Sequence, residues 1–202
     1  MRLTTALAAT TAGAALLSVS LLGAAPAAAD AKAGSSMTHI RTSPALAPTL
    51  ESVGVVAYTQ GTATSQVIGT SLATADSSYL FHVPISAVRA TVQHRGGSIV
   101  LFNTANDQQV VVQNPAIDLS KGVVTARVPG VGANVTVFRI TNPAKVKKTT
   151  TTEDGLRKTS YTGAKLALAP GVADVLVAGL GLPAGSLPDG AAFGTADVTV
   201  FG

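Results

Sequence analysis

The chain of 202 residues contains no cysteine and no tryptophan, and only 4% of its residues are aromatic. The absence of cysteine excludes disulfides, thiol nucleophiles and thiolate metal sites. Charged residues make up 12%, about half of the ~25% that is usual in globular domains. Hydrophobic residues make up 47%. This balance is typical of a membrane protein or of an Ala/Gly-rich secreted protein, and in the second case packing alone must stabilise the fold.

The N-terminus favours the secreted class. Residues 1–29 predict a signal peptide, because Arg2 is followed by an uncharged apolar run and by the small residues Ala27-Ala28-Ala29. No later stretch reaches the roughly 18 consecutive apolar residues that span a bilayer. We therefore expect a secreted, extracellular protein that does not span the membrane after cleavage.

Two further segments follow the predicted signal peptide. Residues 30–48 are expected to form a flexible leader, because they begin with small polar residues. The stretch from Pro44 to Pro48 is a stiffer connector to the domain. Residues 49–202 have a suitable length for one domain.

Short strands with period-two patterning dominate this domain. Val88, Ala90 and Val92 alternate with polar residues, and Gly96-Gly97 predicts a turn into the next strand. Residues 170–180 have the spacing of one short amphipathic helix. The pattern predicts an all-β fold, an antiparallel two-sheet β-sandwich with one or two short helices, and a closed barrel is the alternative.

Residues 143–162 differ from the rest because they are rich in lysine and threonine. Asp154-Gly155 lies between β-branched runs and predicts a projecting β-hairpin. We expect it either to keep the protein soluble or to bind anionic polymers of the cell envelope, such as teichoic acid. No aromatic residues alternate with the basic ones, so nucleic acid is not an expected partner. The candidate partner-binding residues are Lys145, Lys147, Lys148, Arg157 and Lys158.

Residues with catalytic or metal-binding spacing are scarce. No Gly-x-Ser-x-Gly motif occurs, and the glutamates, Glu51 and Glu153, have no paired spacing. His82 and His94 lack the His-x-His or His-Glu-x-x-His spacing of metal sites. We expect no catalytic residues and no metal. A hydrolase whose Ser, His and Asp meet only in space remains an alternative.

The order of several segments is similar to that of known proteins. The segments are 92–99, 110–115, 119–128, 135–140, 163–168, 170–180 and 187–200. This order resembles secreted actinobacterial proteins of unknown function and, more remotely, the HtaA-like family of haem-binding domains. In that family, a Gly-His-x-Gly-x-Leu turn precedes a strand ending in Asn-Pro. The resemblance implies a two-sheet β-sandwich.

The resemblance also implies a haem site. His94 matches the family histidine that hydrogen-bonds the axial tyrosinate. The family's N-terminal segment rich in Trp, Ser and Phe has no counterpart here, so Tyr58 and Tyr79 are the candidate iron ligands. Our first hypothesis is a secreted non-enzymatic protein that binds surfaces at the cell envelope without a cofactor. An HtaA-like haem-binding module is the alternative.

Overall fold

Antiparallel strands make up most of the structure, a computed structural model that describes residues 35–74 and 76–202. The all-β class predicted from the sequence is confirmed. The predicted signal peptide lies outside the described residues.

Ten strands form one continuous hydrogen-bonded path in the order β2-β7-β8-β9-β10-β12-β13-β1-β4-β3. Their bounds are β1 (Met37–Thr42), β2 (Val55–Gly61), β3 (Thr64–Ile68), β4 (Ser78–Pro84), β7 (Gly97–Asn103), β8 (Gln108–Asp118), β9 (Val123–Val128), β10 (Gly132–Ile140), β12 (Leu156–Leu168) and β13 (Ala192–Phe201). The short strands β5 (Ala87–Val88) and β6 (Val92–Gln93) pair with each other, and β6 also pairs with β8. Strand β11 (Lys147–Glu153) pairs with β12.

Strand β1 lies inside the segment that was expected to be a flexible leader. It pairs with β13 on one side and with β4 on the other. Thr38, Ile40 and Thr42 point inward and are buried, whereas His39 and Arg41 lie on the other face. The hydrophobic alternation is hidden because two of the three inward residues are threonines. Residues 37–42 therefore complete the sheet instead of leading into it.

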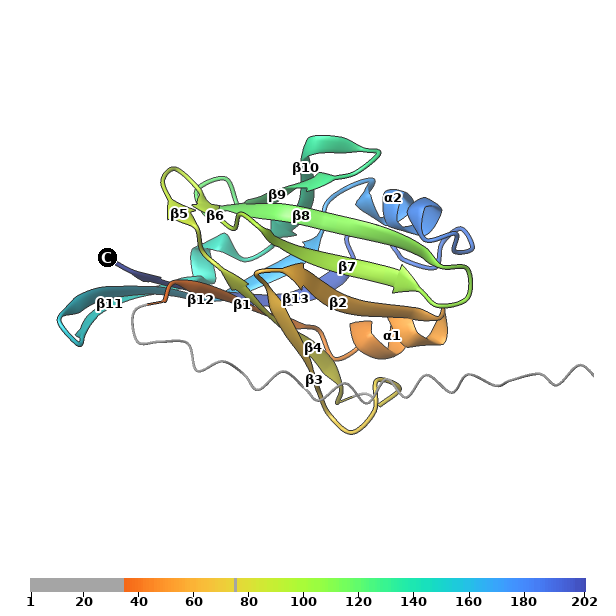
Figure 1. Ribbon diagram of the computed structural model, residues 1–202, viewed down its shortest axis with the longest axis horizontal. Coiled ribbons are helices and arrows are strands. Elements are labelled where there is room, and N and C mark those ends of the chain that lie inside the picture. The colour runs from red at the N-terminus through yellow and green to blue at the C-terminus, as the bar shows by residue number, and fades with distance from the viewer. Residues whose placement is uncertain (1–34, 75) are drawn as a thin grey trace, which may run out of the picture. The chain divides into compact units, whose positions relative to one another are not determined.

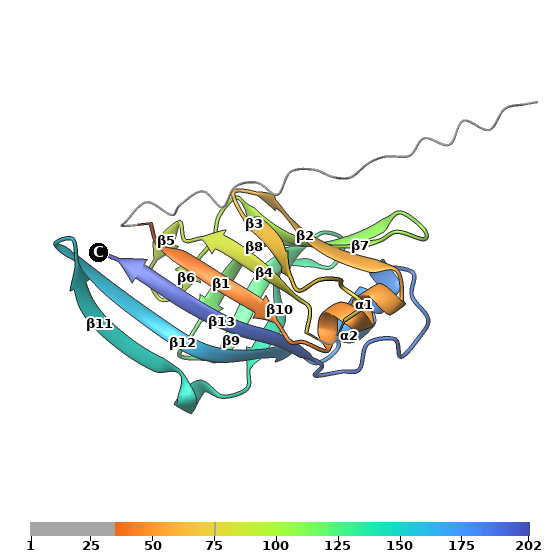
Figure 2. The same cartoon turned by 90° about the horizontal axis from the view of Figure 1, so that it is seen from below.

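Two α-helices lie at one end of the sheet, and the β11–β12 hairpin extends from the other end (Figures 1 and 2). Helix α1 (Leu46–Ser52) buries Leu46, Ala47 and Leu50. Helix α2 (Val172–Gly179) falls within the helix predicted over residues 170–180. The 3₁₀ turn η1 (Pro143–Lys145) precedes the hairpin. None of the helices in the described part of the chain is both long and apolar enough to cross a membrane.

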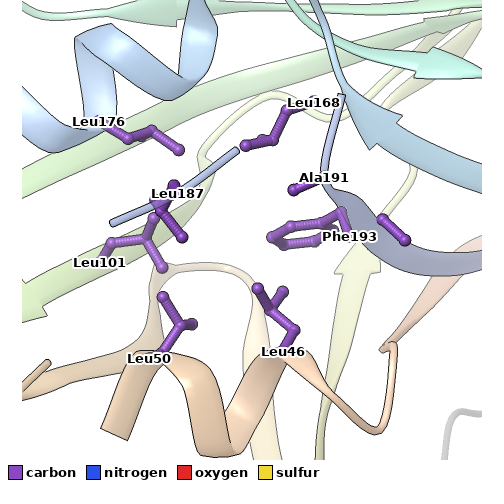
Figure 3. A pocket seen from close by; sticks show the side chains of 9 residues that line it. Leu46, Leu50, Leu101, Leu168, Leu176, Leu187, Ala191 and Phe193 are labelled. Carbon is purple, nitrogen blue, oxygen red and sulfur yellow. The ribbon is translucent and has the colours of Figure 1, made fainter. Parts of the chain in front are cut away.

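The space between the helices and the sheet is lined by aliphatic side chains and Phe193. Figure 3 shows Leu46 and Leu50 of α1 facing Leu176 and Leu187 across a small gap. The cavity there has a volume of about 10 Å³, which is about what one water molecule needs. Phe138 and Phe193 also pack closely, with ring centroids 4.4 Å apart. The core is therefore closely packed, as a domain without disulfides requires.

We predict that Gly194→Ala destabilises the fold, because β13 approaches β1 closely at this glycine. A Cβ atom on Gly194 would overlap the carbonyl oxygen of Arg41 and lie 2.7 Å from Thr42 Cα. We expect a loss of about 1–3 kcal/mol in the free energy of unfolding, measured by urea denaturation. Thr195→Ala, at an exposed position next to it, is the control and should change the stability by less than about 0.5 kcal/mol. An unchanged midpoint for Gly194→Ala would contradict the close approach.

Candidate functional site

His94, the histidine of the predicted haem site, is buried between strands, with 1% of its surface exposed. Its Nδ1 lies 2.8 Å from the carbonyl oxygen of Pro115, and its Nε2 lies 2.7 Å from Thr38 Oγ1. A carbonyl oxygen only accepts hydrogen bonds, so Nδ1 carries the proton and Nε2 accepts from the Thr38 hydroxyl. Burial lowers the pKa of His94, and the bond to Pro115 acts in the opposite direction. The ring is therefore neutral, and both nitrogens are hydrogen-bonded.

The space beside His94 is small and apolar. A cavity of about 10 Å³ is lined by His94, Thr38, Val83, Phe138 and Leu166, among others. This volume is about enough for one water molecule. Haem binding at His94 would require neighbouring strands to separate.

The two candidate tyrosine ligands lie elsewhere. Tyr58 is partly exposed on β2, and its hydroxyl donates to Gln109 Oε1 at 3.4 Å. Tyr79 is 2% exposed, its hydroxyl has no hydrogen-bond partner among the described residues, and burial raises its pKa. Tyr79 precedes Val83, which lines the His94 cavity, by four residues on β4, or about 13 Å along the strand. The structure does not bring these tyrosines to His94, and haem binding stays a prediction.

A wider groove of about 430 Å³ lies near Tyr58. Gln60, Gln109 and Gln113 contribute amide groups to its lining, and Val131 and Val175 contribute apolar surface. Its volume is within the range of about 300–1,000 Å³ that is usual for small-molecule sites. Sequence reasoning missed this groove because its polar residues come from two strands and form no motif.

The β11–β12 hairpin carries the predicted partner-binding residues. All seven residues of β11 are exposed. The turn residues Asp154 and Gly155 both have positive φ, 50° and 79°, as the tight turn predicted from Asp-Gly requires. Lys148 lies opposite Tyr161 and Thr152 lies opposite Arg157. Since side chains alternate between the faces of a strand, Lys148 and Arg157 share one face, and Lys147 and Lys158 share the other.

The basic residues of the hairpin differ in their contacts. Lys158 Nζ lies 2.7 Å from Glu153 Oε2 and 5.7 Å from the centroid of the Phe201 ring. Lys148 Nζ lies 5.6 Å from the centroid of the Tyr161 ring. Among the described residues, Glu153 and Lys158 form the one ion pair in the hairpin. The charges of Lys145, Lys147, Lys148 and Arg157 thus stay available to a partner.

A pair of histidines that sequence reasoning did not bring together lies on β1 and β4. His39 is directly opposite His82 in the antiparallel register. Their Nδ1 atoms are 2.8 Å apart, and the ring planes are at 88° with centroids 4.8 Å apart. Burial lowers the pKa of His39, His82 lowers it further, and Asp197 raises it. His39 lies in the predicted leader and is 43 residues from His82, so no local pattern indicates this contact.

In the described part of the chain, His82 and His94 do not make the hydrogen bonds of a Ser-His-Asp triad. In residues 35–74 and 76–202, neither His82 nor His94 has a hydrogen bond to a serine or an aspartate. The carboxylate of Asp118 accepts hydrogen bonds from Ser120 and Lys121, and the bond from the Ser120 side chain is the main cause of its lowered pKa. The same residues contain no group of three or more His, Cys, Asp or Glu side chains placed to hold a metal ion.

Comparisons with known proteins add no relative from which a function could be transferred. No protein-family model, curated protein or solved structure matches the chain.

We predict that stability falls as the pH is lowered below about 6.5, the ordinary pKa of a histidine in an unfolded chain. The pKa of His94 is lowered in the folded state, so protonation favours the unfolded state. The expected slope is at most about 1.4 kcal/mol per pH unit for this residue, measured by urea denaturation between about pH 7.5 and 5.5. His94→Gln should lower the stability and reduce the slope. An equal slope in this variant would contradict the assignment.

Proposed function

We propose that this protein acts outside the cell as a non-enzymatic binding protein, and that its β11–β12 hairpin contacts an anionic polymer of the cell envelope. The observation that carries this proposal is the exposed basic hairpin, whose turn lies at the end of the sheet opposite the helices (Figure 2). Residues 143–162 contain five basic and two acidic residues. The excess of positive charge favours a partner with phosphate or carboxylate groups.

The form of the hairpin suits an extended polymer better than a compact ligand. Basic residues lie on both faces of the ribbon that β11 forms with β12, so no single pocket gathers them. The other edge of β12 pairs with β13 from Lys158 onward. Thr149 to Thr152 are exposed and add hydroxyl donors beside the charges. A polymer that runs along the ribbon can contact several lysines and threonines in succession. Such contacts are weak individually and depend on salt.

The first test replaces three lysines of the hairpin. Lys145→Ala, Lys147→Ala and Lys148→Ala in one protein should weaken binding to isolated Gram-positive cell walls at least tenfold at low salt. Each basic residue near an anionic surface contributes about 1 kcal/mol, so three account for more than this factor. Binding is measured by sedimentation with the walls. The binding of the unsubstituted protein should itself fall steeply as sodium chloride is added.

A charge-matched control separates the hairpin from net charge. Arg89, Arg95 and Arg127 are exposed and lie outside the hairpin. Their combined replacement by alanine removes the same three charges and should leave most of the binding intact. If this control loses as much affinity as the lysine variant, or if salt has no effect, the hairpin proposal fails. Walls stripped of teichoic acid indicate whether that polymer is the partner.

Haem binding is the alternative that the HtaA-like resemblance implies, and a hemin titration distinguishes it from the first proposal. The envelope-binding proposal expects no saturable shift of the Soret band. A saturable shift that is lost in Tyr58→Ala or Tyr79→Ala would favour the haem-binding module instead. A hydrolase would need His82 or His94 to leave its present hydrogen bonds, and no observed contact favours it.

For the form of the sheet, we propose a flattened two-layer sandwich whose outermost strands, β2 and β3, come close to each other. The hydroxyl of Thr59 on β2 lies 3.3 Å from that of Ser65 on β3, next to the short connection between the two strands. A closed barrel is the alternative. Hydrogen exchange separates the two forms, because closure would protect backbone amides of β2 and β3 that a sandwich leaves open to solvent.

A further inference from the structure

We propose that His39 and His82 together bind a divalent transition-metal ion, such as Zn²⁺ or Cu²⁺, on the outer face of β1 and β4. The proposal starts from their contact, in which two imidazole Nδ1 atoms face each other at 2.8 Å. Both side chains are only partly buried, so an ion can reach them from solvent. This site is independent of the basic hairpin.

The backbone holds the two rings together without help from a loop. His39 and His82 are directly opposite each other, with the pairs Thr38–Val83 and Ile40–Phe81 on either side. Phe81 and Val83 are almost completely buried, and they anchor β4 on both sides of His82. The spacing of the two histidines is therefore fixed by the sheet. Ligands fixed in this way lose little entropy when the ion binds.

The observed distance is close to the one that an ion requires. Zn²⁺ binds imidazole nitrogen at about 2.0–2.1 Å, and a tetrahedral angle then places two such nitrogens about 3.3 Å apart. The Nδ1 atoms are now 2.8 Å apart. They need to separate by only about half an ångström, and small rotations of the two side chains supply this.

The protonation state also suits a metal. Two nitrogens at hydrogen-bond distance share one proton, so one ring donates through Nδ1 and the other accepts. When the ion binds, the donating ring changes its tautomer: its Nδ1 proton leaves to solvent and its Nε2 takes a proton up. Both rings thus stay neutral, and both Nδ1 atoms coordinate the ion.

The surrounding charges on all neighbouring strands are few. Asp197 of β13 lies opposite His39, and its carboxylate accepts a hydrogen bond from the Gly163 amide. Arg41, two residues further along β1, donates from Nε to Ser78 Oγ at 3.1 Å. Lys165 of β12 is exposed and lies opposite Thr195, two residues before Asp197 on β13. Thr64 of β3 lies opposite His82 and is uncharged. Asp197 thus offsets part of the charge of an ion.

The ligand set selects the class of metal. Imidazole nitrogens favour Zn²⁺, Cu²⁺ and Ni²⁺, whereas Mg²⁺ and Ca²⁺ prefer oxygen ligands. Two histidines leave the other coordination positions to water or to a ligand from a partner. We therefore expect an open, exchangeable site and not a structural one.

The test is a calorimetric titration of the full chain with zinc chloride at about pH 7.5, where unperturbed histidines are mostly neutral. We expect one ion per chain, and His39→Ala and His82→Ala should each weaken binding at least tenfold. Magnesium chloride should give no binding. Glu153→Gln removes a carboxylate of the hairpin and should leave the affinity for Zn²⁺ unchanged. Lowering the pH to about 5.5 should weaken binding more than tenfold, because protons compete for the nitrogens.

A spectroscopic readout covers the case in which a variant folds poorly. Zn²⁺ should shift the side-chain ¹⁵N resonances of His39 and His82. The resonances of the buried His94 should stay in place. Binding that leaves the resonances of both His39 and His82 unchanged would overturn the proposal. The proposal would also be overturned if both alanine variants bound Zn²⁺ as tightly as the unsubstituted protein does. No binding at millimolar Zn²⁺ would overturn it as well.

Discussion

The pairing of β1 with both β13 and β4 is the interaction on which the other features depend. Successive residues of this strand point to opposite faces. Thr38 points inward and donates its hydroxyl hydrogen to His94, whereas His39 points outward and meets His82. One strand thus connects the polar centre of the interior with the histidine pair on the surface. If β1 were displaced, both contacts would be lost together.

Because the chain has no tryptophan and only 4% aromatic residues, His94 has an unusual role. It is among the largest side chains that are fully buried, beside Phe81 and Leu50. A neutral imidazole occupies volume that an aromatic hydrocarbon ring fills in many cores. Its burial is tolerated because both nitrogens have partners, since an unpaired polar group in this position would cost about 1–3 kcal/mol. The interior is therefore organised around a hydrogen-bonded polar group as well as by apolar packing.

The sequence predicted the elements that depend on local signals. The Asp154-Gly155 turn specifies the hairpin, and the apolar spacing after Pro170 specifies α2. Strand β1 could not be predicted in this way, because Thr38 and Thr42 replace apolar residues at two of its inward positions. These threonines are buried because β1 pairs with strands that are distant in sequence, and no local sequence pattern indicates such pairing.

The candidate sites were predictable to a similar extent. The basic residues of the hairpin were found because they are neighbours in the sequence. The division of their charges between two faces depends on the register, and the pairing of His39 with His82 depends on β1. The burial of His94 depends on packing by Thr38 and Pro115, which approach it from other strands. The sequence thus predicted candidate residues but not how they lie relative to one another.

The position of β1 also has a consequence for the order of folding. Thr38, near the start of the described chain, pairs with Val198, near its end. During synthesis, β1 is made before β13 and cannot pair with it until the strands between them have been made. Contacts between such distant residues slow folding, because a long loop must close before they form. Strand β1, which joins β13 to β4 in the strand order, is thus among the last strands to complete its pairing.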